Sequence, residues 1–559
     1  MNDTARAAIV LVIAALATLG GCSNPFRNLN SDYGPTPSPD QVRRIDSLGL
    51  ESQRVQSPPD SEILRQEPPN PFEGLESMPV TLEQIRAWTL QNNLDLRVAL
   101  IDPAIANETV SEEEAAWEAV FFSNLRISDR DQPTSSVLVG SETSLAEFDF
   151  GVRVPLRTGG EVTVRLPFDR FETNNAFSTL NPSFTADAEI SISQPLLRGG
   201  GRRANTHALR VAALSEGISE ARTKLEIIRQ IAAADRAYWR LYAAREALEV
   251  AQQQYELAVA QLERSERRVR AGDVAEIEVV RSQEGVAQRL EGIIIAQNEV
   301  RLRQRELKRL VHLPGLDLNS PVMIETESAP APAEYDFESD ALVDMGIANR
   351  MELLELELQL AIDESSIAFE RNRALPLFTV DYTYRLNGLG TSTSNAVDQL
   401  TSAEFDDWIF GLTGEIPIGN NAAKSRVQRS ILERLQRLAT RDARESQITQ
   451  EVLDAIDNID SGWQRILAAS QTAILAARTL LGEQRQFDVG RRTSTDVLDA
   501  ATRLADAQLA EIRAIVEYEI GKVDLAFATG TTLGAARVNW TPLDPREDDA
   551  GPVAFSDAE

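Results

Sequence analysis

Two carboxylates stand three residues apart at the start of a predicted helix, Asp496 and Asp499. Residues at this spacing share one face of a helix, so the two acids lie close together. Several copies gathered around one axis would raise one another's pKa and attract cations. The alternative is structural: Asp496 caps the helix and Asp499 is a solvated acid of the first turn, both stabilised by the helix dipole. The residue types alone favour this structural role.

A tight turn between two helices positions these acids. Gly490 can adopt a positive φ and end the first helix, and Thr493 or Ser494 together with Asp496 can cap the second. The sequence therefore predicts the tip of a helical hairpin. A weaker copy of the pattern surrounds Gly272 and predicts a second tip.

The helices that lead to the two tips are predicted to be very long. They cover residues 203–270 and 422–489, and about 68 residues at 1.5 Å each extend roughly 100 Å. Shorter helices follow at 275–312 and 495–527. Apolar residues recur every seven positions, as in coiled coils that pack side by side. The two seams consist of Leu241, Leu248, Tyr255, Leu262 and Val269, and of Val452, Ile459, Ile466, Ala473, Leu480 and Phe487.

The chain consists of two similar halves, residues 79–315 and 336–530, joined by a Pro-rich linker at 316–335. Phe487 and Val269 each lie three residues before their tip glycine, and this agreement continues along both helices. Such agreement indicates internal duplication.

Each half is predicted to open with a helix and to continue into β segments. In the first half, Thr81 and Gln84 form a capping box, a break is expected near Pro103, and the β segments cover 119–195. In the second half, the strands are 377–384 and 407–416, and Arg350 to Leu353 echoes Asn93 to Leu96. A hairpin near 148–170 has no counterpart in the second half.

The N-terminal segment is predicted to be a targeting signal. A short apolar run within residues 1–21 precedes Cys22, the only cysteine, as in a bacterial lipobox whose cysteine becomes lipidated. An ordinary signal peptide with an incidental cysteine is the alternative. Residues 22–78 are expected to form a disordered Pro-rich tether, and residues 531–559 a disordered acidic tail.

Composition excludes several classes of function. The net charge of −30 argues against nucleic acid as a partner. One cysteine and two histidines leave no Cys/His metal cluster, and no cofactor motif is present. No nucleophile or metal-ligand set accompanies Asp496 and Asp499, so an enzyme is not expected. Few strands per chain cannot close a β-barrel, which needs about eight, so subunits must combine.

Residues 489–500, with Leu504, Ala507 and the strand end at 194–197, resemble TolC-type outer-membrane efflux proteins. The resemblance covers about residues 80–530. It implies a mixed α/β membrane protein built as a homotrimer. A shared 12-stranded outer-membrane β-barrel, with about four strands per subunit, would continue into a periplasmic coiled-coil barrel of long α-helices.

The resemblance also implies function and partners. It predicts the outer-membrane channel of a tripartite efflux or type I secretion system, which works with a periplasmic adaptor (membrane fusion protein) and an inner-membrane pump of RND or ABC type. The expected location is the bacterial outer membrane, lipid-anchored, with a large periplasmic part. The alternative is a non-conducting coiled-coil lipoprotein of the envelope, which would need the heptads but not the β segments.

The resemblance further assigns roles to residues at the tips. Glu278 and Phe487 occupy positions where better-known members have Asp and Tyr, so the closed state is expected to differ in its hydrogen bonds. The assigned residues are Asp496 and Asp499 for the pore constriction, Arg492, Glu278, Gln261 and Phe487 for the gate network, and Gly272, Val489, Gly490 and Arg491 for adaptor docking.

Overall fold

The computed structural model describes residues 71–72, 74–135, 139–536 and 538. All of them belong to the compact unit Pro68–Glu559. The expected signal peptide, Cys22 and the greater part of the tether and the tail lie outside the described residues. Within the described part of the chain, no helix is long and apolar enough to cross a membrane.

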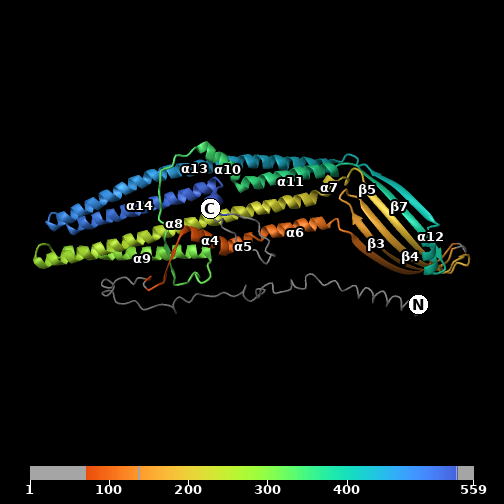
Figure 1. Ribbon diagram of the computed structural model, residues 1–559, viewed down its shortest axis with the longest axis horizontal. Coiled ribbons are helices and arrows are strands. Elements are labelled where there is room, and N and C mark those ends of the chain that lie inside the picture. Colours follow the sequence, from red (N-terminus) through yellow and green to blue (C-terminus); the bar gives the residue numbers. More distant parts are fainter. Residues whose placement is uncertain (1–70, 73, 136–138, 537, 539–559) are drawn as a thin grey trace, which may run out of the picture. The chain divides into compact units, whose positions relative to one another are not determined.

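Two very long helices form the main axis of this unit (Figure 1). They are α8 (His207–Ala271) and α13 (Asn421–Asp488). Each is followed by a tip and a shorter antiparallel helix, α9 (Ile277–Val311) or α14 (Ser494–Ala528). These bounds lie within a few residues of the predicted ones, except that Thr206 separates a short α7 (Arg202–Asn205) from α8.

The opening helix of each half is broken at the equivalent position. The first half has α4 (Leu82–Asn92), α5 (Leu94–Ala99) and α6 (Asp102–Ala115), and the second has α10 (Ser339–Asn349) and α11 (Met351–Arg373). Asn93 and Arg350 are both extended, with ψ of 126° and 124°. The expected break near Pro103 is present, but the break at Asn93 was not expected. The side chain of Asn93 accepts a hydrogen bond from Leu96 N at 3.0 Å, which starts a new helix there.

The predicted capping box of α4 is confirmed. Thr81 Oγ1 accepts a hydrogen bond from Gln84 N at 3.3 Å, and Gln84 Oε1 accepts one from Thr81 N at 2.9 Å. Two of the free N–H groups at the helix start are thereby satisfied.

Six antiparallel strands form one continuous sheet in the order β2-β3-β4-β5-β7-β8. The strands are β2 (Val120–Asp131), β3 (Glu142–Pro155), β4 (Glu161–Thr173), β5 (Ser183–Pro195), β7 (Leu377–Gly390) and β8 (Asp406–Glu415). The expectation of about four strands per subunit is therefore wrong for this chain. The extra hairpin, β3 and β4, is inserted between β2 and β5 and pairs with both.

The sheet has one apolar and one polar face, because side chains alternate along each strand and the register places residues of the same polarity on the same face. The polar face also carries apolar exceptions, which are Val120, Phe122, Leu145, Phe171, Leu377, Leu389 and Ile409. The apolar face carries Phe121, Leu125 and Ile127 of β2, Phe148, Phe150 and Val152 of β3, Val164, Leu166 and Phe168 of β4, Ile190 and Ile192 of β5, Tyr382 and Tyr384 of β7, and Trp408, Phe410 and Leu412 of β8. The polar face carries Asn124 and Arg126, Glu147, Asp149 and Arg153, Arg165 and Asp169, Glu189, Ser191 and Ser193, Asp381, Thr383 and Arg385, and Asp407.

The predicted strand 377–384 ends too early, and the segment that follows it is not only a connecting loop. Strand β7 continues to Gly390, and a helix α12 (Thr393–Ser402) follows. Ala396 of α12 is fully buried, and its backbone lies directly over Gly388 and Gly390, where no Cβ would fit.

Short strands lie in the segments that were predicted to be a tether and a linker. Strand β1 (Ser77–Val80) begins within the expected tether, and β6 (Met323–Thr326) lies in the linker; the two pair in parallel. Four-residue strands are too short to show an alternating pattern. The hydroxyl of Tyr238 holds this pair against α8, because it donates to Val80 O at 3.2 Å and accepts from Ser328 N at 2.8 Å.

The start of the expected tail is also packed. A one-turn helix α15 (Thr532–Ala535) is followed by Ala536 and Val538, which are buried in a cluster with Leu90, Leu96, Ile227 and Ile231. Residue 537 and the part beyond residue 538 lie outside the described residues.

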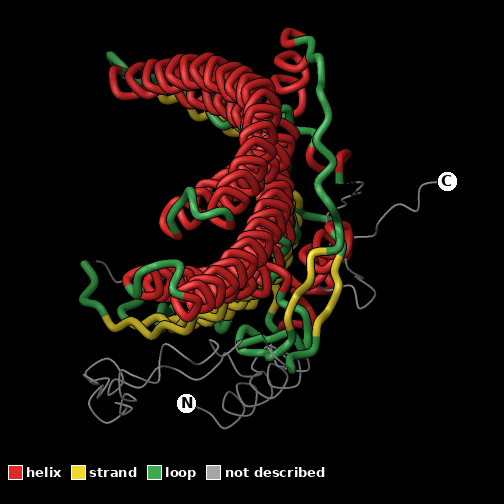
Figure 2. The backbone as a smooth tube through the Cα atoms, turned by 90° about the vertical axis from the view of Figure 1, so that its left-hand side faces the viewer, coloured by secondary structure: helices red, strands yellow, loops and turns green. Residues whose placement is uncertain are grey.

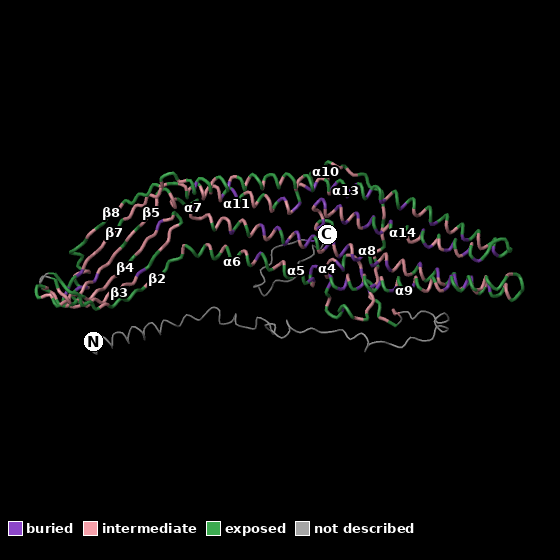
Figure 3. Tube along the Cα trace, turned by 180° about the vertical axis from the view of Figure 1, so that it is seen from behind, coloured by how far each residue is buried: buried purple, intermediate pink, exposed green. Residues whose placement is uncertain are grey.

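The helices form a curved layer rather than a closed bundle (Figure 2). Near the tips the order of packing is α9, α8, α14, α13, and nearer the sheet it is α6, α8, α11, α13. Buried residues gather where α4 packs on α8 and α9 and where α10 packs on α13 (Figure 3). Because the layer is one helix thick over most of its length, each long helix keeps an exposed side.

Candidate functional site

The two helical tips close with the same backbone hydrogen bonds. In the first tip, Gly272 N donates to Val269 O at 3.0 Å and Asp273 N to Arg268 O at 2.9 Å. In the second, Gly490 N donates to Phe487 O and Arg491 N to Gln486 O, both at 2.9 Å. The glycines have φ of 78° and 74°, as the predicted turns require.

Glu278 links the two tips. Its Oε2 accepts a hydrogen bond from Ser494 N at 3.1 Å and a second, short one from the Ser494 hydroxyl. Its Oε1 accepts from Arg281 at 2.8 Å. Burial raises the pKa of Glu278, but the bonds from Ser494 and the charge of Arg281 outweigh it, so the pKa lies below its usual value. The carboxylate is therefore ionised and caps the start of α14 from the other hairpin.

Phe487 belongs to a second contact between the hairpins. The Arg268 guanidinium lies 4.9 Å from the centre of the Phe487 ring and donates to Phe487 O at 2.8 Å. The ring itself is buried against Leu480, Val497, Ala500 and Ala501. Such a contact joins a cation–π attraction to a charge-assisted hydrogen bond.

Arg492 pairs within its own hairpin. Its Nε lies 3.0 Å from Glu483 Oε2, and its Nη1 lies 3.8 Å from Asp496 Oδ1. The side chain is half exposed, which limits the energy of these pairs. In the described part of the chain, no hydrogen bond or ion pair joins Arg492 to Glu278, Gln261 or Phe487.

Asp496 has the structural role that the residue pattern favoured. Its Oδ2 accepts from Thr493 N and from the Thr493 hydroxyl, both at 2.9 Å, and forms a capping box at the start of α14. These bonds, helped by Arg492, lower the pKa of Asp496. Asp499 is exposed and has no hydrogen-bond or ion-pair partner among the described residues.

Gln261 lies apart from the other predicted gate residues. It is buried in α8, and its Nε2 has no hydrogen-bond partner among the described atoms. It borders a narrow cleft between the hairpins together with Arg264, Arg289 and Leu498. The four predicted gate residues thus fall into separate contacts within one chain.

Sequence reasoning missed the partners of these residues. Arg268 and Glu483 stand on long helices among many other charged side chains, so nothing in their spacing sets them apart. Ser494 was considered only as a cap. The predicted docking residues Gly272, Val489, Gly490 and Arg491 are all exposed at the tips.

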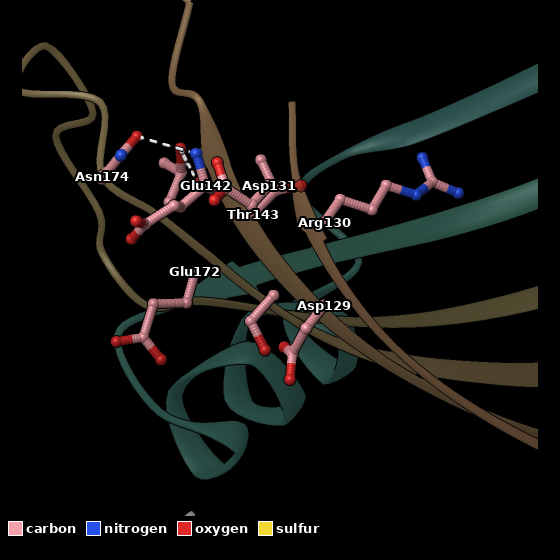
Figure 4. Close-up of a pocket in the computed structure, with 9 residues that line it drawn as sticks. Asp129, Arg130, Asp131, Glu142, Thr143, Glu172 and Asn174 are labelled. Atoms are coloured by element: carbon pink, nitrogen blue, oxygen red, sulfur yellow. Dashed lines mark hydrogen bonds between the residues drawn. The ribbon is translucent and has the colours of Figure 1, made fainter. Parts of the chain in front are cut away.

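The end of the sheet that lies away from the helical tips carries an acidic surface pocket of about 570 Å³ (Figure 4). It lies at the ends of β2, β3 and β4 and is lined by Asp129, Asp131, Glu142 and Glu172 among others. No group that could hold a metal ion is found among the described residues. Sequence analysis did not single out this pocket.

The lateral edges of the layer expose apolar side chains that no other part of the described chain covers. One edge follows β8 and α13, where Leu467, Ile474 and Leu481 recur every seven residues with 47%, 44% and 53% of their surface exposed. The other edge follows β2, α6 and α9. Its exposed apolar residues include Ile105 on α6 and Ile294, Ile295 and Leu302 on α9.

The class of this protein follows from its long paired helices and from a sheet with one apolar and one polar face. Residues 342–531 match the family model for outer membrane efflux proteins. The resemblance to TolC-like outer-membrane efflux proteins is confirmed.

The relatives support the same class. The outer membrane protein TolC of Vibrio cholerae serotype O1 is 23% identical over 298 residues, or 53% of this chain. That match spans 66% of the relative's own length, slightly under two thirds. Its name places the relative in the outer membrane.

Solved channels share the fold. The outer-membrane channel OprN has a TM-score of 0.61 at 16% identity, over 80% of this chain and 90% of its own. The CmeC outer membrane channel of Campylobacter jejuni has a TM-score of 0.59 at 16% identity, over 81% of this chain and 86% of its own. Both structures are of outer-membrane channels.

Proposed function

We propose that this protein is the outer-membrane channel of a tripartite efflux or type I secretion system. Three copies form a ring in which the sheets close a β-barrel in the outer membrane. The long helices continue that barrel as a tunnel through the periplasm. An adaptor and an inner-membrane pump of RND or ABC type bind at the tip end.

The two-faced sheet is the observation that carries this proposal. Its apolar face is rich in aromatic and branched residues, whereas its polar face carries charge pairs such as Arg165–Glu189 at 3.2 Å and Arg385–Glu189 at 2.9 Å. A transmembrane barrel needs an apolar outer face toward lipid and a polar lumen. A non-conducting coiled-coil lipoprotein would need no such sheet.

The exposed edges support closure by further copies of the same chain. Strands β2 and β8 are the free edges of the sheet, and an open edge cannot remain unpaired in lipid. The β8–α13 edge differs from the β2–α6–α9 edge, so copies associate head to tail and form a closed ring. The number three comes from the resemblance to TolC-type proteins.

The tips form the closed gate in this proposal. Asp499 and Asp496 of three copies surround the axis, and adaptor and pump open the tips like an iris. Arg492, Glu278, Gln261 and Phe487 belong to the network that rearranges, and Gly272, Val489, Gly490 and Arg491 receive the adaptor. Cys22 carries the lipid anchor after removal of residues 1–21.

Reconstitution tests the proposal. The full chain is extracted from outer membranes. Its oligomeric mass is determined by native mass spectrometry, and its conductance is measured in planar bilayers. We expect a trimer with discrete cation-selective conductance. Leu467→Glu with Ile474→Glu should dissociate the trimer, whereas Thr472→Glu, at an exposed position on the other side of α13, should not. A monomeric or non-conducting wild-type protein would refute the channel.

A further inference from the structure

The extra hairpin β3–β4 is part of the wall of the sheet and not an appendage to it. It pairs with β2 over twelve residue pairs, from Val120↔Arg153 to Asp131↔Glu142, and with β5 from Glu161↔Ser193 to Phe171↔Ser183. Without this hairpin, β2 and β5 would be the neighbouring strands. The hairpin therefore widens the sheet from four strands to six.

Both faces of the hairpin continue the pattern of the sheet. On the apolar face, the Phe150 and Phe168 rings are stacked with centres 6.1 Å apart. On the polar face, Arg165 of β4 pairs with Glu189 of β5 at 3.2 Å, and Glu147 of β3 pairs with Arg126 of β2 at 3.4 Å. A hairpin folded away from the barrel would have no reason to keep an apolar face in register with its neighbours.

The strand directions permit closure. With six alternating strands, β2 and β8 run antiparallel to each other, so β8 of one copy can pair with β2 of the next in a fully antiparallel barrel. Three copies of six strands make eighteen. Strands about 4.8 Å apart and tilted about 40° then give a diameter of about 36 Å, against about 24 Å for twelve strands.

The helical part fits the wider barrel. Four helices per chain lie side by side near the tips, so three copies place twelve helices around the tunnel. At about 9 Å between neighbouring axes, that cylinder is about 34 Å across. An eighteen-stranded barrel continues it at nearly constant width.

We propose that the trimer forms an eighteen-stranded barrel in which hairpin β3–β4 sets the width, so that the size limit for cargo lies at the tips and not in the membrane. This inference rests on the trimer of the proposed function. Barrels of 16–18 strands are wide enough for an open aqueous channel.

Deletion of residues 142–173 tests this inference, because the remaining strands β2, β5, β7 and β8 still alternate in direction. Trimers of the wild-type protein and of the deletion variant in lipid nanodiscs are imaged by electron microscopy along the ring axis. We expect eighteen strands in the wild type and a barrel about 1.5-fold wider than that of the deletion variant. Graded polyethylene glycols added on the barrel side should reach a larger size limit in the wild type.

A wild-type barrel of twelve strands, with the hairpin outside the wall, would overturn the inference while leaving the channel intact. So would a dimer of twelve strands. Loss of ring and conductance in the wild type would instead refute the proposed function itself.

A labelling experiment covers the case in which the deletion variant does not fold. Asp149→Cys should react with a membrane-impermeant thiol reagent. Val152→Cys on the same strand should not react with it, and a fluorescent label attached at that position should be quenched by lipid-attached quenchers. The unsubstituted protein gives the background from Cys22. Equal labelling at both positions would overturn the placement of the hairpin in the wall.

Discussion

Glu278 of one hairpin accepts two hydrogen bonds from Ser494 of the other, one from its backbone N–H and one from its hydroxyl. The side chain of Glu278 is only 13% exposed, so these charge-assisted bonds are well protected from water. This contact holds the two tips of one chain together.

Loss of the Glu278 charge should loosen the tips. A hydrogen bond to a charged group contributes about 1.5–3 kcal/mol, so Glu278→Gln should raise the open probability of single channels about tenfold or more. Ser494→Ala should act in the same direction. Glu276→Gln, an exposed neighbour, is the matched control. Unchanged gating in Glu278→Gln would rule out this contact as a gate element.

The same contact predicts the effect of pH. The pKa of Glu278 is lowered in the closed tip, because the bonds from Ser494 and the charge of Arg281 outweigh the effect of burial. The contact is therefore complete at every pH above the usual glutamate pKa of about 4.3 and is lost only as the pH falls through the lowered value. Conductance should be constant from pH 7 to 5 and rise below pH 4. Glu278→Gln should remove this rise.

Arg492→Ala should also raise conductance, but less than Glu278→Gln. The Arg492 side chain is 49% exposed, and exposed ion pairs contribute about 0–1 kcal/mol. Single-channel recording in the absence of adaptor compares the two variants. Arg491→Ala, at an exposed arginine next to it, is the control. A larger effect of Arg492→Ala would point to partners in a neighbouring subunit.

Asp499 should dominate cation blockade. Asp496 is bound to Thr493 and lies near Arg492, whereas Asp499 has no partner among the described residues. Asp499→Asn should therefore weaken block by divalent or trivalent cations more than Asp496→Asn. Titration of bilayer currents with a trivalent cation measures both. Equal loss in the two variants would show that the bonds from Thr493 and the nearby Arg492 do not weaken the attraction of Asp496 for cations.

Gly490 should be sensitive to any side chain. Its φ of 74° lies in the left-handed region, so Gly490→Ala should cost about 1–2 kcal/mol in the free energy of unfolding. The added Cβ meets only Arg268 at 3.4 Å, so the cost comes from the backbone. Gly482→Ala on exposed α13 should instead stabilise by up to about 1 kcal/mol. Thermal unfolding in detergent measures both.

Sequence alone determined the helical part of this protein. Heptad seams and tip glycines locate α8, α9, α13 and α14 to within a few residues, because a long periodic pattern is repeated over many turns. The capping box at Thr81 followed from two residues at fixed spacing. The motif at 489–500 was specific enough to indicate the class of protein.

Tertiary structure decided how these elements combine. Whether the hairpin at 142–173 stands apart or joins the sheet depends on pairing with strands far along the chain, which alternation within one segment does not reveal. The same holds for β1 and β6, which are separated by more than 240 residues. The partners of the tip residues, Ser494 for Glu278 and Arg268 for Phe487, come from different hairpins. Their contacts exist only because α8 packs against α14, and that packing is a property of the folded chain.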